Sequence, residues 1–372
     1  MPANICKPSS TTFTEDKRMK KTRIGIIGVG NISEIHIQSY LNDPRVELYA
    51  FCDIDPVILA QKGEKYGVKR LYTDLDEMLA LPELEGVSVC TWNCAHAECT
   101  IKALRAGKHV LCEKPMALNT AQAEEMQRTA EETGKTLMIG FVRRFGADCA
   151  MLQEYKEADF LGDIYYAKVW NLRRHGNPGG WFGDKARSGG GPLIDLGVHV
   201  IDLMCYTMGN SIKPVSVYGA AFHKLGNRPN TKDKPAYISP SARPDDVCDV
   251  EDLATALIRF DNGAVLSVEV SFALNIPQET SGFSLYGTKG GITTAPEFTL
   301  STDVNGRMAN IRLCSPAEFD FKSFHDEISH FVDCIRDGVP CRNPGQDGVK
   351  LMKILDAIYA SAASGHEVEI HW

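Results

Sequence analysis

Short apolar runs alternate with amphipathic segments along the first 140 residues. Residues 22–28 form an apolar run that ends in glycine, a pattern typical of a buried parallel strand. A helical segment follows at about Ser33–Leu41, and a second strand, Val46–Cys52, ends at Asp53. The alternation continues through Val87–Thr91, Ala95–Ala106, His109–Cys112, Thr120–Thr133 and Thr136–Gly140. This order predicts an N-terminal doubly wound parallel sheet with helices on its faces.

The pattern changes after about Phe145. The expected elements are a helix at Ala147–Lys156, a strand at Asp163–Asn171, an apolar helix at Pro192–Met208, a strand at Val215–Phe222, and helices at Ser323–Asp337 and Gly345–Ser364. We therefore divide the chain into 1–20, a disordered or loosely attached segment, and two domains, 21–145 and 146–372. A polar, proline-containing segment, 226–249, predicts a long surface insertion that is either functional or a variable excursion.

Two strands, Val250–Phe260 and Ala264–Phe272, are joined by the turn sequence Asp261-Asn262-Gly263, which predicts a hairpin. One face is wholly apolar and should pack on the core; it carries Ala254, Ala256, Ile258, Phe260, Leu266, Val268, Val270 and Phe272. The other face is less polar than a solvated face should be; it carries Thr255, Leu257, Val265, Ser267 and Glu269. We predict that this second face meets another subunit.

Composition narrows the class of protein. The length of 372 residues suggests two domains, and 44% hydrophobic with 24% charged residues is ordinary for a globular protein. A net charge of -8 disfavours nucleic-acid binding, and no apolar run reaches membrane-spanning length. The first 18 residues lack the apolar stretch of an export signal, and the twelve cysteines are scattered, so we predict a cytoplasmic protein with free thiols.

The first strand leads into Gly28-Val29-Gly30-Asn31-Ile32-Ser33, a GxGxxS sequence. The first glycine permits a tight turn, the second lets backbone approach a pyrophosphate, and the following helix N-terminus binds phosphates. Asp53 ends the second strand at the distance expected for an acidic residue that binds the adenosine ribose and repels a 2′-phosphate. The motif therefore predicts NAD in preference to NADP; the alternative is a glycine turn without a ligand.

The helix at 192–208 is apolar on almost every side, so it should be buried. Its polar residues Asp195, His199 and Asp202 are spaced i, i+4, i+7, which predicts one stripe on which Asp195 pairs with His199 and favours a protonated imidazole. Such a pair suits proton transfer, although a satisfied core pair is the alternative. Lys114, which follows a strand of the first domain, should point into the crevice or be an ordinary surface lysine; Pro115 makes its loop rigid and allows a cis bond.

Three segments carry a resemblance to a known family: 28–32 (GVGNI), 106–117 (AGKHVLCEKPMA) and 189–203 (GGGPLIDLGVHVIDL). The chain resembles the glucose–fructose oxidoreductase/inositol dehydrogenase/MocA (Gfo/Idh/MocA) family from about Lys21 to Trp372. The resemblance implies a Rossmann domain followed by a substrate-binding α/β domain with a large, mostly antiparallel sheet. It also implies a homodimer or homotetramer formed through that sheet.

The resemblance also implies site residues. Lys114, Asp195 and His199 match the catalytic positions, with His199 the acid/base, Asp195 orienting it and Lys114 polarising the reacting hydroxyl, or with Lys114 itself the base. The cofactor positions, besides Asp53, are Gly28, Gly30, Asn31, Ile32, Thr91, Asn93, His96, Glu113, Lys114, Arg144 and Trp181. Substrate hydroxyls are expected at Arg173 and His175 as well as at Lys114, Asp195 and His199. The chain has Trp92 at a position where many members of the family have proline.

The implied reaction is oxidation of a secondary hydroxyl of a sugar, of a glycoside at C3, or of an inositol, with hydride transfer to NAD. The alternatives are an NAD-dependent glycosidase or lyase that oxidises only transiently, and a non-catalytic NAD-sensing protein. No metal site is predicted, because His325 and His330 are five residues apart and Cys90, Cys94 and Cys99 lack a zinc spacing. The two histidines are instead expected on a helix surface.

Overall fold

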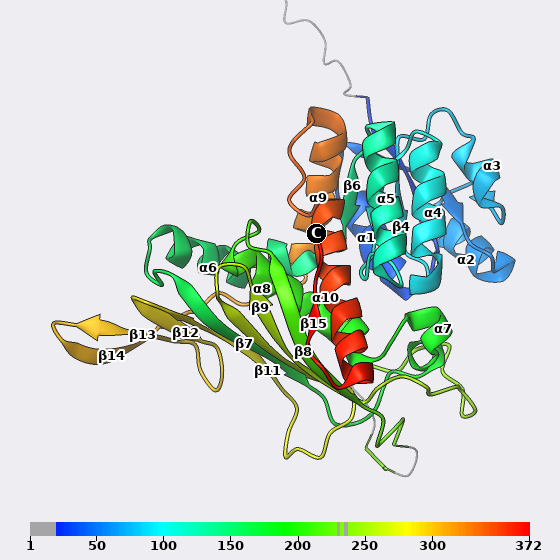
Figure 1. Cartoon of the computed structure of the whole chain (residues 1–372). Coiled ribbons are helices and arrows are strands. Elements are labelled where there is room, and N and C mark those ends of the chain that lie inside the picture. The colour runs from blue at the N-terminus through cyan, green and yellow to red at the C-terminus, as the bar shows by residue number, and fades with distance from the viewer. Residues whose placement is uncertain (1–19, 229–230, 234–236) are drawn as a thin grey trace, which may run out of the picture.

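The computed structural model describes residues 20–228, 231–233 and 237–372, which form two α/β units, each built on one sheet (Figure 1). The prediction for residues 1–20 therefore falls almost entirely outside the described residues, as do two short parts of the 226–249 insertion. None of the helices in the described ranges is long and apolar enough to cross a membrane.

The first sheet is parallel throughout, with the strand order β3-β2-β1-β4-β5-β6. Its strands are β1 (Thr22–Ile27), β2 (Val46–Cys52), β3 (Leu71–Tyr72), β4 (Gly86–Val89), β5 (His109–Cys112) and β6 (Leu137–Ile139). Its helices are α1 (Asn31–Leu41), α2 (Pro56–Tyr66), α3 (Leu75–Leu79), α4 (Asn93–Arg105) and α5 (Thr120–Thr133). The predicted doubly wound sheet is confirmed. The order reverses between β1 and β4, the place where such sheets bind ligands at their carboxyl ends.

Two local differences have simple causes. Helix α1 begins at Asn31 and not at Ser33, because Gly30 with its extended backbone is the N-cap. The short elements α2, β3 and α3 lie between the predicted strands; the carboxylates of Asp55 and Asp74 cap the two helices, a signal that the apolar pattern alone does not carry.

The second sheet is mostly antiparallel, with the order β14-β13-β12-β11-β7-β10-β9-β8-β15, and β7 and β10 are its parallel pair. Its strands are β7 (Ile164–Leu172), β8 (Pro214–Phe222), β9 (Leu253–Phe260), β10 (Val265–Ser271), β11 (Thr280–Gly287), β12 (Gly290–Thr293), β13 (Thr299–Val304), β14 (Arg307–Arg312) and β15 (Val368–Glu369). The hairpin of β9 and β10 and its buried apolar face are confirmed. The pattern did not locate β11 to β14: β12 to β14 are short, and buried and exposed positions do not alternate regularly along β11.

Helices cover one face of this sheet (Figure 1). The remaining elements are η1 (Val142–Phe145), α6 (Ala147–Glu157), η2 (Gly180–Gly183), α7 (Lys185–Ser188), η3 (Leu193–Gly197), α8 (Val198–Met208), α9 (Lys322–Asp337) and α10 (Gly345–Ser364). Helix α9 returns to the first unit, where Phe331 and Val332 share a core with Ile24 and Ile26. The predicted boundary at residue 145 divides the chain by position in the sequence. Helix α9 comes after this boundary but packs against the first domain.

Candidate active site

A cavity of about 310 Å³ lies between the carboxyl ends of the first sheet and the second unit. This volume falls in the range of small-molecule sites, roughly 300–1,000 Å³. The cavity brings together predicted residues from both domains: Asn31, Ile32, Thr91, Asn93, His96, Glu113, Lys114, Trp181 and Asp195. The other lining residues are Ile35, Phe182, Ser188, Gly190, Ile194 and Tyr237, of which Gly190 and Ile194 lie in the segment 189–203 that carries the family resemblance.

The glycine loop beside this cavity has the geometry that a phosphate group needs. Gly28 has φ +82°, and a Cβ there would lie 2.8 Å from the carbonyl oxygen of Cys90. A Cβ on Gly30 would instead meet no atom within 4 Å, so backbone faces open space beside the N-terminus of α1. The residues therefore fit a dinucleotide, whose pyrophosphate the free amides of α1 would bind.

Asp53 is bound to this loop through its side chain. Its Oδ2 accepts a hydrogen bond from the Val29 amide at 2.7 Å, and its Oδ1 accepts one from the Asp55 amide at 2.9 Å. The carboxylate is half-buried and is not part of the cavity wall. Asp53 thus helps to shape the loop and keeps lone pairs for a ribose hydroxyl.

His96 and Asn93 connect loops around the cavity. The His96 ring lies between the carbonyl oxygens of Pro115, 2.7 Å from Nδ1, and Thr91, 3.2 Å from Nε2. Burial lowers the pKa of His96, although both carbonyls oppose this effect. Asn93 Nδ2 donates to the Ser188 carbonyl at 2.8 Å and so joins the two domains.

Lys114 and Asp195 form an ion pair across the crevice. Lys114 Nζ lies 3.1 Å from Asp195 Oδ1 and 3.3 Å from the Asp195 carbonyl oxygen, and each side chain is mostly buried. The crevice prediction for Lys114 is confirmed, and its bond to Pro115 is cis. Two ammonium hydrogens face Asp195, which leaves one for a bound hydroxyl.

The predicted stripe of Asp195, His199 and Asp202 is wrong. Residues Leu193–Gly197 form a π-helical turn, so the segment is not one regular α-helix and i, i+4 spacing no longer aligns side chains. No hydrogen bond or ion pair within the described chain joins Asp195 to His199, whose Nδ1 is buried without a hydrogen-bond partner. Asp195 pairs with Lys114 instead.

The expectation of a protonated His199 is also wrong. Burial, and then the positive charges of Lys114, Arg143 and Arg173, hold the pKa of His199 well below its usual value. Among the described residues, no ion pair or hydrogen bond to a carboxylate offsets these effects. His199 is therefore a neutral imidazole near pH 7, the form that accepts a proton.

Two carboxylates, both buried, support the site: Glu113, which the sequence predicted as a cofactor position, and Glu251, which no sequence motif reveals. Glu113 Oε1 lies 2.8 Å from His36 Nε2. Burial raises the pKa of Glu113, but the His36 hydrogen bond and nearby positive charges outweigh it and lower the pKa. Glu251 accepts hydrogen bonds from the Gly191 and Leu193 amides at 3.0 and 3.1 Å. Glu251 thus holds the glycine run that precedes Asp195.

The 226–249 insertion contributes to the cavity. Tyr237 lies among the lining residues with Trp181 and Phe182, and its hydroxyl accepts a hydrogen bond from Asn31 Nδ2 at 3.1 Å. The carboxylate of Asp246 accepts a bond from the Gly180 amide at 2.6 Å. The functional interpretation of the insertion is therefore favoured over a variable excursion.

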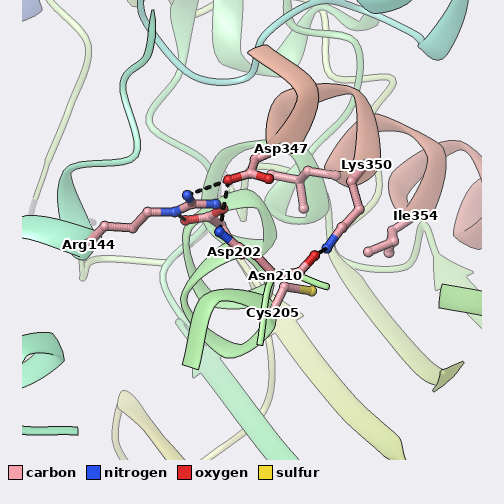
Figure 2. Close-up of a pocket in the computed structure, with 8 residues that line it drawn as sticks. Arg144, Asp202, Cys205, Asn210, Asp347, Lys350 and Ile354 are labelled. Carbon is pink, nitrogen blue, oxygen red and sulfur yellow. Dashed lines mark hydrogen bonds and ion pairs between the residues drawn. The ribbon is translucent and has the colours of Figure 1, made fainter. Parts of the chain in front are cut away.

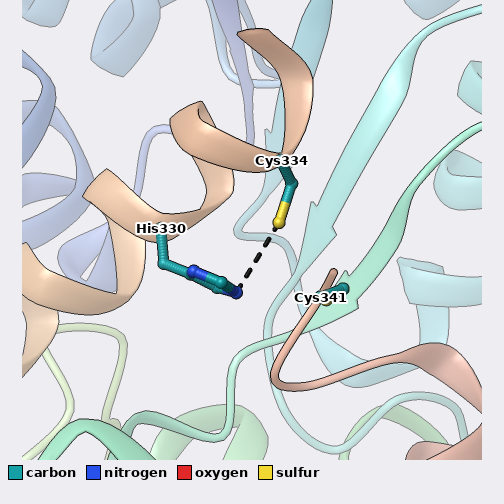
Figure 3. Close-up of side chains that lie close together, drawn as sticks. All are labelled: His330, Cys334 and Cys341. Carbon is teal, nitrogen blue, oxygen red and sulfur yellow. Dashed lines mark hydrogen bonds between the residues drawn. The ribbon is translucent and has the colours of Figure 1, made fainter. Parts of the chain in front are cut away.

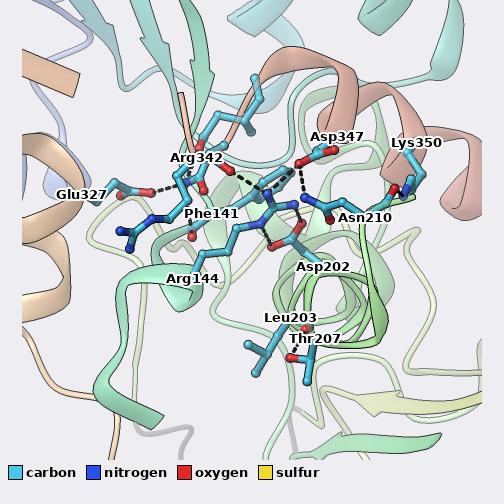
Figure 4. A network of polar contacts seen from close by, with 12 residues as sticks. Phe141, Arg144, Asp202, Leu203, Thr207, Asn210, Glu327, Arg342, Asp347 and Lys350 are labelled. Carbon is cyan, nitrogen blue, oxygen red and sulfur yellow. Dashed lines mark hydrogen bonds and ion pairs between the residues drawn. The ribbon is translucent and has the colours of Figure 1, made fainter. Parts of the chain in front are cut away.

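Arg144 lies elsewhere, in a buried ion-pair cluster. It donates two hydrogen bonds to Asp202, at 2.9 and 2.6 Å, and one to Asp347 at 2.6 Å; Figure 4 shows the three side chains converging. The cavity beside them, drawn in Figure 2, is about 10 Å³, room for about one water. The family-based assignment of Arg144 to the cofactor is not supported, because its donors are taken by Asp202, Asp347 and the Arg342 carbonyl.

Arg173 and His175 follow β7 and do not line the large cavity. The Arg173 backbone is bound to Ser271, and its charge contributes to the lowered pKa of His199. His175 Nε2 lies 3.9 Å from Glu279 Oε1. Their predicted contact with substrate hydroxyls stays a prediction.

The parallel sheet, the second sheet and the cavity between them have the architecture of a two-domain dehydrogenase. The family model of the NAD-binding Rossmann oxidoreductases matches residues 22–141, and that of the GFO/IDH/MocA C-terminal domain matches residues 150–293. The chain belongs to the Gfo/Idh/MocA family, and it is an oxidoreductase with NAD as its cofactor.

Named relatives cover nearly the whole chain. It is 34% identical to D-glucoside 3-dehydrogenase of Escherichia coli (strain K12), over 94% of this chain and 97% of the relative. It is 27% identical to myo-inositol 2-dehydrogenase of Thermotoga maritima, over 88% of this chain and 92% of the relative. The structure is similar to that of an aldose-aldose oxidoreductase from Caulobacter crescentus complexed with glycerol, with TM-score 0.76, 25% identity, and 94% and 100% of the two chains covered.

Proposed function

We propose that the protein oxidises a secondary hydroxyl of a sugar, of a glycoside at C3, or of an inositol to a ketone. The single observation that carries this proposal is the Lys114–Asp195 pair on the wall of the cavity beside the glycine loop. The 34% identity to a D-glucoside 3-dehydrogenase favours a glucoside as the first substrate to test.

His199, Lys114 and Asp195 each have a role in removing the proton of the substrate hydroxyl. Bound NAD would supply the acceptor for the hydride that leaves the substrate carbon. Neutral His199 accepts the hydroxyl proton, because its low pKa leaves the imidazole free near pH 7. Lys114 donates a hydrogen bond to the oxygen on which negative charge develops, and Asp195 holds the Lys114 ammonium in place. Of the two candidate bases, this arrangement favours His199, since Lys114 already donates to Asp195.

Substrate oxidation should appear as NADH formed in equal amount with a ketone. The test is a screen of the wild-type protein with NAD and methyl glucosides, free sugars, anhydrosugars and inositols, followed by absorbance and by NMR of the product. Release of the aglycone without net NADH would contradict the proposal and identify a glycosidase or lyase. Cofactor binding without turnover of any compound would favour an NAD sensor.

Asp53 should determine cofactor preference. Asp53→Asn keeps the size of the side chain and removes the charge that repels a 2′-phosphate, so we expect the ratio of kcat/KM for NADP to that for NAD to rise at least about tenfold. Asp163→Asn removes the same charge from an exposed position in the second domain and is the matched control. An unchanged ratio in Asp53→Asn would contradict the role given to Asp53.

We propose that the protein forms a homodimer or homotetramer through the open face of the second sheet. Gly219 faces Ile358 of α10, so its neighbour Tyr218 points away from the helices, where it pairs with Leu257. These two side chains are 52% and 50% exposed. Tyr218→Asp combined with Leu257→Asp should yield a monomer in sedimentation, whereas Leu41→Asp, at an equally exposed leucine of α1, should not. A monomeric wild type would contradict this assembly.

A further inference from the structure

Three side chains with metal-binding atoms lie together outside the active site. His330 and Cys334 are on α9, and Cys341 is in the loop 338–344 that follows it; their ligand atoms all lie within 4.8 Å of one another. Figure 3 shows the two α9 side chains on the side of the helix that faces Cys341. None of the three lines the large cavity.

The chain geometry explains why these residues meet. His330 and Cys334 are four residues apart on one helix, so they project from the same face. Gly338, with φ +65°, ends α9 in the left-handed conformation and lets the chain turn back past that face. The HxxxxH spacing of His325 and His330 does not reveal the cluster, because the partners of His330 are the cysteines at positions 334 and 341.

The observed spacing suits a tetrahedral zinc ion. His330 Nε2 lies 3.6 Å from Cys334 Sγ. Zinc bonds of about 2.0 Å to nitrogen and about 2.3 Å to sulfur, at tetrahedral angles, place the two ligand atoms about 3.5 Å apart. The helix therefore already holds its two ligand atoms at nearly the required separation.

His330 also has the protonation state that a metal needs. The Arg342 amide donates a hydrogen bond to His330 Nε2 at 3.0 Å, so Nε2 is an acceptor and carries no proton. The ring packs against Phe145, with the centroids 5.5 Å apart. A bound metal would replace the Arg342 amide as the partner of this nitrogen.

The cluster is largely shielded from solvent, but a metal ion can reach it. Cys334 is 5% exposed, whereas His330 and Cys341 are half-buried, and both cysteines are free thiols. Two thiolates and an imidazole are soft or borderline ligands, which favour zinc over calcium or magnesium.

We propose that His330, Cys334 and Cys341 form a Cys₂His zinc site, with water completing the coordination. The site joins the end of α9 to the loop 338–344. In that loop, the carbonyl oxygen of Asn343 accepts a hydrogen bond from the Ile139 amide of β6 at 2.9 Å. Zinc would therefore stabilise the connection between the first sheet and α10.

The test uses the full-length protein, reduced and freed of metal with a chelator. Titration with cobalt should produce a thiolate-to-cobalt absorption band at one equivalent, and zinc should remove it. Cys334→Ser and Cys341→Ser should each weaken zinc binding at least about 100-fold. Cys314→Ser, at an exposed cysteine outside the cluster, should bind zinc as the wild type does.

A second measurement needs no variant. Zinc should protect Cys334 and Cys341 of the wild type from alkylation, as identified by peptide mass spectrometry, while Cys314 stays reactive. Failure of the reduced protein to bind one equivalent of zinc or cobalt would overturn the proposal; peptide mapping of a Cys334–Cys341 disulfide would then identify a redox pair instead. Binding that survives both serine substitutions would overturn it as well.

Discussion

His199→Ala is expected to lower kcat by about 10²- to 10⁴-fold, the usual contribution of a general base, with the affinity for NAD nearly unchanged. His199 is not among the residues that line the cavity together with Asn31 and Ile32 of the glycine loop, so its removal should affect proton transfer and not cofactor binding. Steady-state kinetics with the substrate found in the screen, together with NAD titration by fluorescence, measure the two effects separately.

The pH profile distinguishes a base from a residue with a merely structural role. His199 must be neutral to accept a proton, and its pKa lies well below its usual value, so wild-type oxidation should decline only in acid, below about pH 6.5. In His199→Ala this acid limb should disappear, and added imidazole should restore part of the rate.

His223→Ala is the matched control, because His223 is exposed and lies at the end of β8. Its kcat and its pH profile should equal those of the wild type. A near-normal kcat in His199→Ala would exclude His199 as the base. Retention of the acid limb by that variant would assign the titration to another group.

Arg144→Met is expected to destabilise the protein by about 3–5 kcal/mol, as removal of one partner from a buried ion pair does. The Arg144 side chain is 1% exposed and neutralises Asp202 of α8 and Asp347 of α10, so its loss leaves two carboxylates in a desolvated place. Chemical denaturation followed by circular dichroism measures the change in the free energy of unfolding.

The loss of stability in Arg144→Met should depend on pH in a defined direction. Burial raises the pKa of Asp202 even with Arg144 present, and without Arg144 the folded protein should hold that proton more tightly still. A group whose pKa is raised by folding stabilises the protein in acid, and this stabilisation is lost as the pH rises through the folded pKa. Arg144→Met should therefore be closer to the wild type in acid than at neutral pH.

Two further variants make the stability prediction specific. Arg128→Met removes an exposed arginine that pairs with Glu132 at 3.7 Å, and it should cost less than about 1 kcal/mol. Asp202→Asn added to Arg144→Met should recover part of the stability, because it removes one of the uncompensated charges. An Arg144→Met protein as stable as Arg128→Met would contradict the structural role of the cluster.

Local features of the chain were sufficient to predict the parallel sheet of the first domain, except for β3, and its cofactor loop. The apolar run that leads into Gly28, together with Gly30 and Asp53, predicts strand, turn and acidic residue from spacings of a few residues. The hairpin at Asp261–Gly263 is equally local, because a two-residue alternation and a turn define it. In the second domain the pattern did not predict β11 to β14, since β12 to β14 are short and buried and exposed positions do not alternate regularly along β11.

The sequence by itself determined the Rossmann unit. It also led to the expectation of NAD as the preferred cofactor and to Lys114, Asp195 and His199 as candidate catalytic residues. Only the tertiary structure decided the partners: Asp195 with Lys114, Asp202 with Arg144, and His199 left neutral. The physical reason is that a single π turn at Leu193–Gly197 changes which side chains share a face, and that residues 58 or 81 positions apart meet only after both sheets have packed.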